Sequence, residues 1–383
     1  MRPSPRGGLD VVPLGATSPT ETPPDKERRA APARLGLAVG LGAVAGTVSA
    51  LAILLTFWAT GAFKGSTIIQ KEQSPPASDL RAGGTVVDVA RRARPAIVSV
   101  RLGGSSVSPE GSGSGVIIRS DGYVITNHHV VRGASSVTIE LSSGRSYPAR
   151  VIGSDAETDV AVVKIEAGDL PVATLGTARN LEVGQLAIAI GSPLGLAGGP
   201  SVTVGVISAL GRSVPVDGGQ TLLDMIQTDA PVAPGSSGGA LLDERGAVVG
   251  ITTAAAVTEA GALDFGFATA IDIARREADQ LVATGRVVHP LIGLEGRSLD
   301  SDAAARLHVN GGALVTNVQP GTPADQSGIR TGDVVVAFDN EPVGSMDEFT
   351  VSLRSRSPGD RVELDVARGG NRLKVTVVLG ARS

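Results

Sequence analysis

The chain has 383 residues, a formal net charge of −4, and 42% hydrophobic against 19% charged residues. This length accommodates two domains, and the absence of a basic run in the body of the chain argues against a nucleic-acid-binding protein. Because there is no cysteine, disulfides, thiolate catalysis and cysteine-based metal sites are excluded. Separately, we expect neither a metal nor a cofactor.

The N-terminal part predicts a tail, a membrane anchor and a linker. Residues 1–33 are rich in Pro, Arg and Gly without apolar periodicity, which is typical of a disordered tail. Residues 34–63 include an uncharged stretch longer than the ~20 residues that a transmembrane helix needs. A buried soluble helix is the alternative, which the interfacial Trp58 and the basic flanks disfavour. The excess of basic residues before this stretch places the tail in the cytoplasm and the rest of the chain, after a flexible linker at 64–85, outside it.

Residues 86–285 predict a mainly β domain. Short Val- and Ile-rich runs separated by Gly, Ser and Asp are typical of strands, and they lie at 97–100, 116–118, 123–125, 137–139 and 160–163. Ser120-Asp121-Gly122, between two of these runs, predicts a hairpin turn. Many short strands without long helices between them favour an all-β barrel or sandwich over a parallel α/β sheet. A helix is expected only at the end, over 272–284, where Gly285 stops it.

Residues 286–383 predict a smaller mixed domain. Strand runs occur at 314–315, 334–336 and 375–378. A helix is predicted over 345–354, because Ser345 followed by Asp347 and Glu348 is the capping chemistry expected at a helix start.

The candidate catalytic residues lie in three short segments of the β domain. His129, one of only four histidines, follows a strand run, Asp159 opens another, and Ser237 stands in the run Gly-Ser-Ser-Gly-Gly. A serine hydroxyl needs a neutral imidazole to accept its proton and a carboxylate to fix the imidazole tautomer. The chain order His, Asp, Ser is that of the proteases built on paired β-barrels, which agrees with the strand-rich pattern.

The residues around the serine predict an oxyanion hole. Backbone amides of Gly235, Ser236 and Ser237 are the candidates, with Gly235 and Ser237 as the proposed donors, since glycine permits the backbone angles that such a site requires. A plain Gly/Ser turn is the alternative for this cluster taken alone. A non-peptidase serine hydrolase is disfavoured, because the sequence shows no Gly-x-Ser-x-Gly elbow between a strand and a helix.

Together these segments resemble the HtrA/Deg family of trypsin-like serine proteases with a C-terminal PDZ domain. The family patterns Thr-Asn-x-His-Val, Thr-Asp-(Leu/Val)-Ala-Val and Gln-Thr-Asp-Ala…Pro-Gly-Asn-Ser-Gly-Gly are met at 126–130, 158–162, 227–230 and 234–239. Two residues differ from the family pattern. Ser236 replaces the usual Asn and offers a hydroxyl next to Ser237, and Ala240 replaces the usual Pro.

The resemblance implies a fold and an activity. It implies two six-stranded barrels with the site in their cleft, and a membrane-anchored, extracytoplasmic serine endopeptidase that acts on unfolded or signal-bearing polypeptides in protein quality control and the stress response. It also suggests a homotrimer. Residues 251–254 and the segment before Ser237 would line the specificity pocket, where the absence of an acid favours cleavage after Val or Ala, with Glu259 as the nearest loop acid.

Within the C-terminal domain, the run from Val318 to Ala324 and the Gly-Asp-Val-Val that follows resemble a bacterial PDZ core. PDZ domains bind a C-terminal peptide as an added strand and hold its carboxylate on backbone amides. By resemblance, Leu291, Ile292, Gly293 and Leu294 form the carboxylate-binding loop. Phe349 and Leu353 on the predicted helix are candidate peptide contacts, with a place in the domain core as the alternative for each.

A different class of function also fits the domain order. A proteolytically silent barrel joined to a PDZ domain would act as a chaperone or scaffold that binds polypeptides. The retention of all three triad residues and of the glycines beside Ser237 argues against it.

Overall fold

The computed structural model describes residues 86–382 apart from 104–111, 193–198, 217–218 and 259–260. The predicted tail, membrane helix and linker all fall before residue 86 and lie outside the described residues. Among the helices that are described, none has the length and apolar character to cross a membrane.

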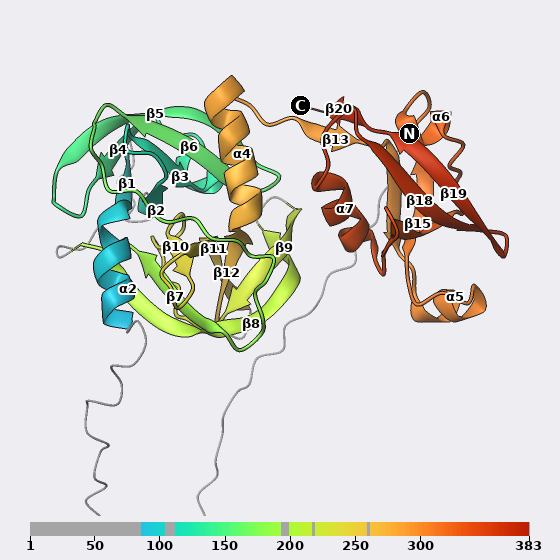
Figure 1. Ribbon diagram of the computed structural model, residues 1–383, viewed down its shortest axis with the longest axis horizontal. Coiled ribbons are helices and arrows are strands. Elements are labelled where there is room, and N and C mark those ends of the chain that lie inside the picture. The colour runs from blue at the N-terminus through green and yellow to red at the C-terminus, as the bar shows by residue number, and fades with distance from the viewer. Residues whose placement is uncertain (1–85, 104–111, 193–198, 217–218, 259–260, 383) are drawn as a thin grey trace, which may run out of the picture. The chain divides into compact units, whose positions relative to one another are not determined.

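The first six strands close into an antiparallel barrel in the order β1-β2-β3-β6-β5-β4 (Figure 1). Their bounds are β1 (Ile97–Gly103), β2 (Ser112–Ile117), β3 (Tyr123–Thr126), β4 (Ser136–Glu140), β5 (Ser146–Asp155) and β6 (Val160–Ile165). The predicted hairpin turn joins β2 to β3, with Gly122 at a φ of 106°. A Cβ at Gly122 would lie 2.2 Å from the carbonyl oxygen of Ile165, so only glycine fits there.

The next six strands close into a second barrel in the order β10-β11-β12-β9-β8-β7. Their bounds are β7 (Leu186–Gly191), β8 (Ser201–Val216), β9 (Gln220–Thr228), β10 (Ala240–Leu242), β11 (Val248–Thr258) and β12 (Gly261–Ala270). The expectation of two six-stranded barrels is therefore confirmed. The Val/Ile runs singled out in the sequence lie in the first barrel, whereas the strands of the second barrel were not predicted individually.

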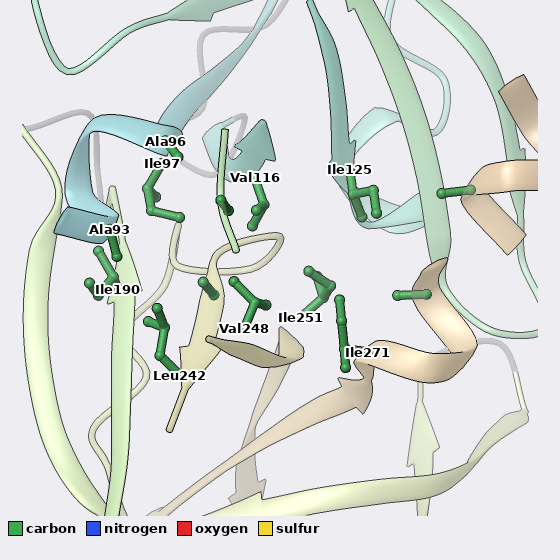
Figure 2. Close-up of a cluster of buried hydrophobic side chains, with 14 of the residues drawn as sticks. Ala93, Ala96, Ile97, Val116, Ile125, Ile190, Leu242, Val248, Ile251 and Ile271 are labelled. Carbon is green, nitrogen blue, oxygen red and sulfur yellow. The ribbon is translucent and has the colours of Figure 1, made fainter. Parts of the chain in front are cut away.

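One apolar cluster joins the two barrels and the helices beside them (Figure 2). Val116 and Ile125 come from the first barrel, Leu242 and Ile251 from the second. The helices α2 (Val86–Ala93), η2 (Arg94–Ala96) and α4 (Ile271–Thr284) complete it, with Val89, Ala96 and Ile271 among their buried side chains. Burial of a Val, Leu or Ile side chain stabilises by ~1.5–3 kcal/mol, so this shared core fixes the barrels against each other.

The helix predicted over 272–284 is confirmed as α4. It ends at Gly285, which has a φ of 76° and donates its amide to the carbonyl of Leu281, as a left-handed C-cap does. The short α2 was not predicted. It buries Val89 and Ala93 against the shared core while Arg91 and Arg92 remain outside, so packing stabilises it rather than length.

The C-terminal part is a mixed domain around one antiparallel sheet. The sheet runs β14-β15-β16-β18-β19, with β17 paired to β16 and the separate pair β13-β20. The bounds are β13 (His289–Leu291), β14 (Leu294–Ser298), α5 (Ser301–Arg306), β15 (Ala313–Val318), α6 (Pro323–Gln326), β16 (Val334–Phe338), β17 (Glu341–Pro342), α7 (Met346–Arg354), β18 (Arg361–Arg368), β19 (Asn371–Val378) and β20 (Gly380–Arg382). The predicted helix is α7, and the Ser345 hydroxyl caps it by accepting the amide of Glu348 at 3.1 Å. Strand β14 lies at one edge of the sheet.

Candidate active site

His129 and Asp159 form a hydrogen-bonded pair in the first barrel. His129 lies on the short helix α3 (His128–Val131), directly after β3, and Asp159 lies directly before β6, the strand that pairs with β3. His129 Nδ1 is 2.7 Å from Asp159 Oδ2, and the His129 amide donates to Asp159 Oδ1 at 2.9 Å. Because a carboxylate only accepts, Nδ1 carries the imidazole proton and Nε2 is left as the basic nitrogen.

The backbone of Asp159 is held in an unusual conformation. Its φ is 55°, a left-handed value that costs a non-glycine residue ~1–3 kcal/mol and persists only where surrounding contacts impose it. Asn127 Nδ2 and the amide of His128 both donate to the Asp159 carbonyl oxygen, at 2.9 and 3.2 Å. These two hydrogen bonds stabilise the strained conformation of Asp159. In that conformation the buried Asp159 carboxylate contacts the imidazole of His129, whose side chain is 44% exposed.

Ser237 lies on the loop before β10 and is bonded to the first barrel through its backbone. Its carbonyl oxygen accepts the amide of Ser114, on β2, at 2.7 Å. The following residue, Gly238, donates its amide to the carbonyl of Thr252 on β11 at 2.7 Å. Ser237 is thus fixed between a strand of each barrel.

The hydroxyl of Ser237 donates to the carbonyl oxygen of Thr253 at 3.0 Å. A hydroxyl has one proton to donate, so in this structure it is not donated to His129. The structure therefore pairs Asp159 with His129 and turns the Ser237 hydroxyl toward β11 instead.

Hydrogen bonds on both sides orient the peptide between Gly235 and Ser236. The Ser236 amide donates to Ala233 O at 2.9 Å, and the Gly235 carbonyl accepts the Ser114 hydroxyl at 2.8 Å. Gly235 has a φ of 87°, in the region that favours glycine. Since the Ser236 amide is already engaged, it is the least available of the three candidate oxyanion donors.

Two domain families match the chain: the trypsin-like peptidase domain over residues 113–251 and the PDZ domain over residues 290–379. The chain is 44% identical over 280 residues to the putative serine protease HhoA of Synechocystis, and the matched region covers 70% of each protein. The chain belongs to the HtrA/Deg family of trypsin-like serine proteases.

Other HtrA/Deg proteins match at similar levels. A probable periplasmic serine endoprotease, DegP-like, from Chlamydia trachomatis is 41% identical over 70% of this chain and 53% of its own length. The chain thus spans about half the length of that relative. The solved structure of the HtrA-type protease AlgW with a tripeptide superposes with a TM-score of 0.67 at 33% identity, covering 78% of this chain and 98% of that one. These matches confirm the prediction of a double-barrel protease domain followed by a PDZ domain.

Two supporting residues of this HtrA/Deg site were not singled out from the sequence. Asn127 is fully buried, and its amide also contacts the Thr253 hydroxyl at 3.2 Å, so it links the Asp159 turn to β11. Ser114 bonds the Gly235 carbonyl and also accepts the amide of Ser192 at 2.7 Å. Asn127 stands inside the Thr-Asn-x-His-Val pattern, which is the signal that could have identified it. Ser114 lies in an ordinary Gly/Ser strand and carries no such signal.

In the PDZ domain, the predicted carboxylate loop runs from β13 into β14. Leu291 ends β13, Ile292 is buried, Gly293 has a φ of 82°, and Leu294 begins β14. Phe349 packs edge to face on Phe338, with ring centroids 6.0 Å apart, and is 1% exposed, so it occupies the core position that was its alternative. Leu353 is partly buried against the same core.

Proposed function

We propose that the chain is a serine endopeptidase with His129, Asp159 and Ser237 as its catalytic triad. The observation that carries the proposal is the bidentate contact of Asp159 with the ring and the amide of His129, together with the hydrogen bonds from both barrels that fix the backbone at Ser237. This arrangement fixes the imidazole with Nε2 available as a base.

The reaction follows from these contacts. The Ser237 hydroxyl leaves the Thr253 carbonyl, gives its proton to His129 Nε2 and attacks the scissile carbonyl carbon. Asp159 stabilises the imidazolium that forms. The amides of Gly235 and Ser237 are the proposed donors to the oxyanion, and loss of one such donor typically lowers the rate by ~10²–10³. Protonated His129 then donates to the leaving amine.

The substrate proposal rests on the pocket and on the relatives. Ile251 and Thr252, on the strand beside Ser237, are buried and offer no acid, which supports cleavage after small or medium apolar residues such as Val or Ala. Relatives in this family are named periplasmic serine endoproteases. We extend this to extracytoplasmic cleavage of unfolded or signal-bearing polypeptides, with the chain anchored by residues 34–63 and assembled as a homotrimer.

We further propose that C-terminal peptides bind the PDZ domain and regulate cleavage. The edge position of β14 leaves one side of that strand without a strand partner in the described sheet, as strand addition requires. The solved AlgW structures carry a tripeptide or a decapeptide. Isothermal titration with peptides that end in an apolar residue tests this, and no binding by any of them contradicts it.

A second candidate, a silent chaperone or scaffold, is favoured by one observation, the Ser237 hydroxyl that donates to Thr253 rather than to His129. Cleavage of unfolded casein by the purified full chain separates the two functions. We expect Ser237→Ala to abolish cleavage and Ser236→Ala to retain it, with circular dichroism to verify folding of both. A wild-type chain that binds casein without cleaving it, with and without added C-terminal peptides, supports the chaperone or scaffold instead.

A further inference from the structure

His289 lies buried in the segment that connects α4 to the C-terminal sheet. Its side chain is 10% exposed, and its Nε2 is 2.8 Å from Asp155 Oδ1, whose side chain is 11% exposed. The two residues are 134 positions apart in sequence. A buried ion pair of this kind is retained only where both partners are hydrogen-bonded, so the contact ties the connecting segment to the end of β5.

The second oxygen of Asp155 holds the turn that leads to Asp159. Asp155 Oδ2 accepts the amide of Thr158 at 2.9 Å and the Thr158 hydroxyl at 2.6 Å. The Asp159 amide in turn donates to the carbonyl of Ala156 at 3.2 Å. Asp155 therefore closes a four-residue turn immediately before the left-handed Asp159. Both oxygens of its carboxylate accept hydrogen bonds, Oδ1 from His289 and Oδ2 from Thr158.

We propose that His289 is a positioning residue for the catalytic site: by bonding Asp155, it holds the 155–158 turn from which Asp159 reaches His129. His289 touches none of the reacting groups and acts only through Asp155. The effect of His289 on the Asp159–His129 contact does not depend on the proposed protease function. Only the catalytic purpose of that contact rests on the proposed function.

Charged groups surround His289 from several elements. Glu157 Oε2 lies 3.9 Å from His289 Nε2 and is itself paired with Arg382 at 2.6 Å, while its other oxygen is paired with Arg354 at 2.7 Å. From α4 the buried Glu277, paired with Arg276 at 2.8 Å, also faces it. The hydrogen bond to Asp155 and the nearby acids raise the pKa of His289, against the opposing effect of burial. The cluster therefore favours a protonated His289.

The site also has access to solvent. Glu157, Thr158, Glu277, His289 and Arg354 border a cavity of about 940 Å³. Protons therefore reach His289 without unfolding of either barrel, and the pair can respond to pH in the folded protein.

The experiment uses the purified full chain, and His289→Ala, His289→Gln and Asp155→Asn are compared with His308→Ala. His308 is exposed and remote in sequence from the triad segments, which makes it a matched histidine control. The first readout is the strongly downfield proton resonance of His129 Nδ1 in the Asp159–His129 hydrogen bond, observed by NMR with ¹⁵N-histidine labelling. With four histidines in the chain, assignment by single substitution is direct. The second readout is the rate at which a fluorophosphonate labels Ser237.

We expect His289→Ala and Asp155→Asn to weaken or abolish the downfield resonance and to slow labelling about tenfold, since small displacements of a catalytic group cost up to ~10²-fold. His289→Gln, which still donates a hydrogen bond, should restore both readouts to within about threefold, and His308→Ala should change neither. Folded His289→Ala and Asp155→Asn chains with an unchanged resonance would overturn the proposal. A wild-type chain that shows the resonance but is not labelled would count against the proposed protease function alone.

Discussion

Gly238, directly after the proposed nucleophile, offers the sharpest test of how the site is built. Its φ is 88°, and a Cβ added there would lie 2.1 Å from the Ser114 carbonyl oxygen and 2.4 Å from the Thr126 hydroxyl. Neither atom can retreat freely, because the Thr126 hydroxyl donates to that same Ser114 oxygen at 2.7 Å and the Ser114 amide donates to Ser237 O. Gly238→Ala must therefore move backbone that holds Ser237.

The loss of stability expected for Gly238→Ala has two parts. A left-handed φ costs a non-glycine residue ~1–2 kcal/mol, and overpacking of a rigid site costs a further ~1–3 kcal/mol. We expect Gly238→Ala to lower the free energy of unfolding by about 2–5 kcal/mol, the sum of these two parts. Gly144, in the turn between β4 and β5, is the matched control: its φ is 81° but nothing lies within 4 Å of its added Cβ. Gly144→Ala should lose only the backbone part, about 1–2 kcal/mol.

Urea unfolding followed by far-ultraviolet circular dichroism measures both variants, and casein cleavage is measured in parallel. Gly238→Ala should lose both stability and cleavage, whereas Gly144→Ala should keep nearly full cleavage. Equal losses of stability in the two variants would refute the reasoning, because they would show that the contacts with Ser114 and Thr126 add nothing to the backbone strain.

Two further predictions concern buried charges. The pKa of His289 is raised from 6.5, so the stability that His289 contributes is complete below pH 6.5 and is lost as the pH rises through the pKa of the folded protein. The pKa of Asp155 is lowered from 3.8, so the stability that Asp155 contributes is present above pH 3.8 and is lost as the pH falls further. The stability difference between wild type and His289→Gln, measured by urea unfolding, should therefore be largest between pH 4 and 6.5 and shrink by pH 9, and a constant difference would contradict it. Arg368→Ala should destabilise the C-terminal sheet by about 2–3 kcal/mol, because the Asp333 side chain is 1% exposed and its bidentate partner, itself 29% exposed, is lost. Hydrogen exchange in β16 measures this, and Asp333→Asn in the Arg368→Ala background should recover part of it.

Local chemistry explains which elements the sequence predicted. Gly285 ends helix α4 and Ser345 caps the start of helix α7, and both helices were predicted to within one residue at each end. The strand β8 (Ser201–Val216) has no such signal. Gly205 and Gly211 interrupt its apolar pattern, and its pairing with β9 shifts register three times. Its length is imposed by closure of the second barrel rather than by its own residues.

The same division holds in the candidate site. Motif spacing sufficed to predict that Asp159 and His129 would meet, and the structure places them 2.7 Å apart. The contact between His289 and Asp155 joins residues from distant segments that share no pattern, so it required the structure. The direction of the Ser237 hydroxyl likewise depends on a backbone carbonyl of β11, which any residue at position 253 would supply.

The orientation of that hydroxyl can be weighed against the two proposed functions. Both backbone neighbours of the side chain are fixed, by Ser114 N–H to Ser237 O and by Gly238 N–H to Thr252 O, each at 2.7 Å. The side chain of Ser237 is therefore the part of the residue that is left to rotate. The bond to be exchanged has a net worth of ~1 kcal/mol, which corresponds to about fivefold in population. A bound substrate that contacts the oxyanion donors readily exceeds this. The bond from the Ser237 hydroxyl to Thr253 is therefore a small energetic bias that a working protease can overcome, and it gives little support to a silent scaffold.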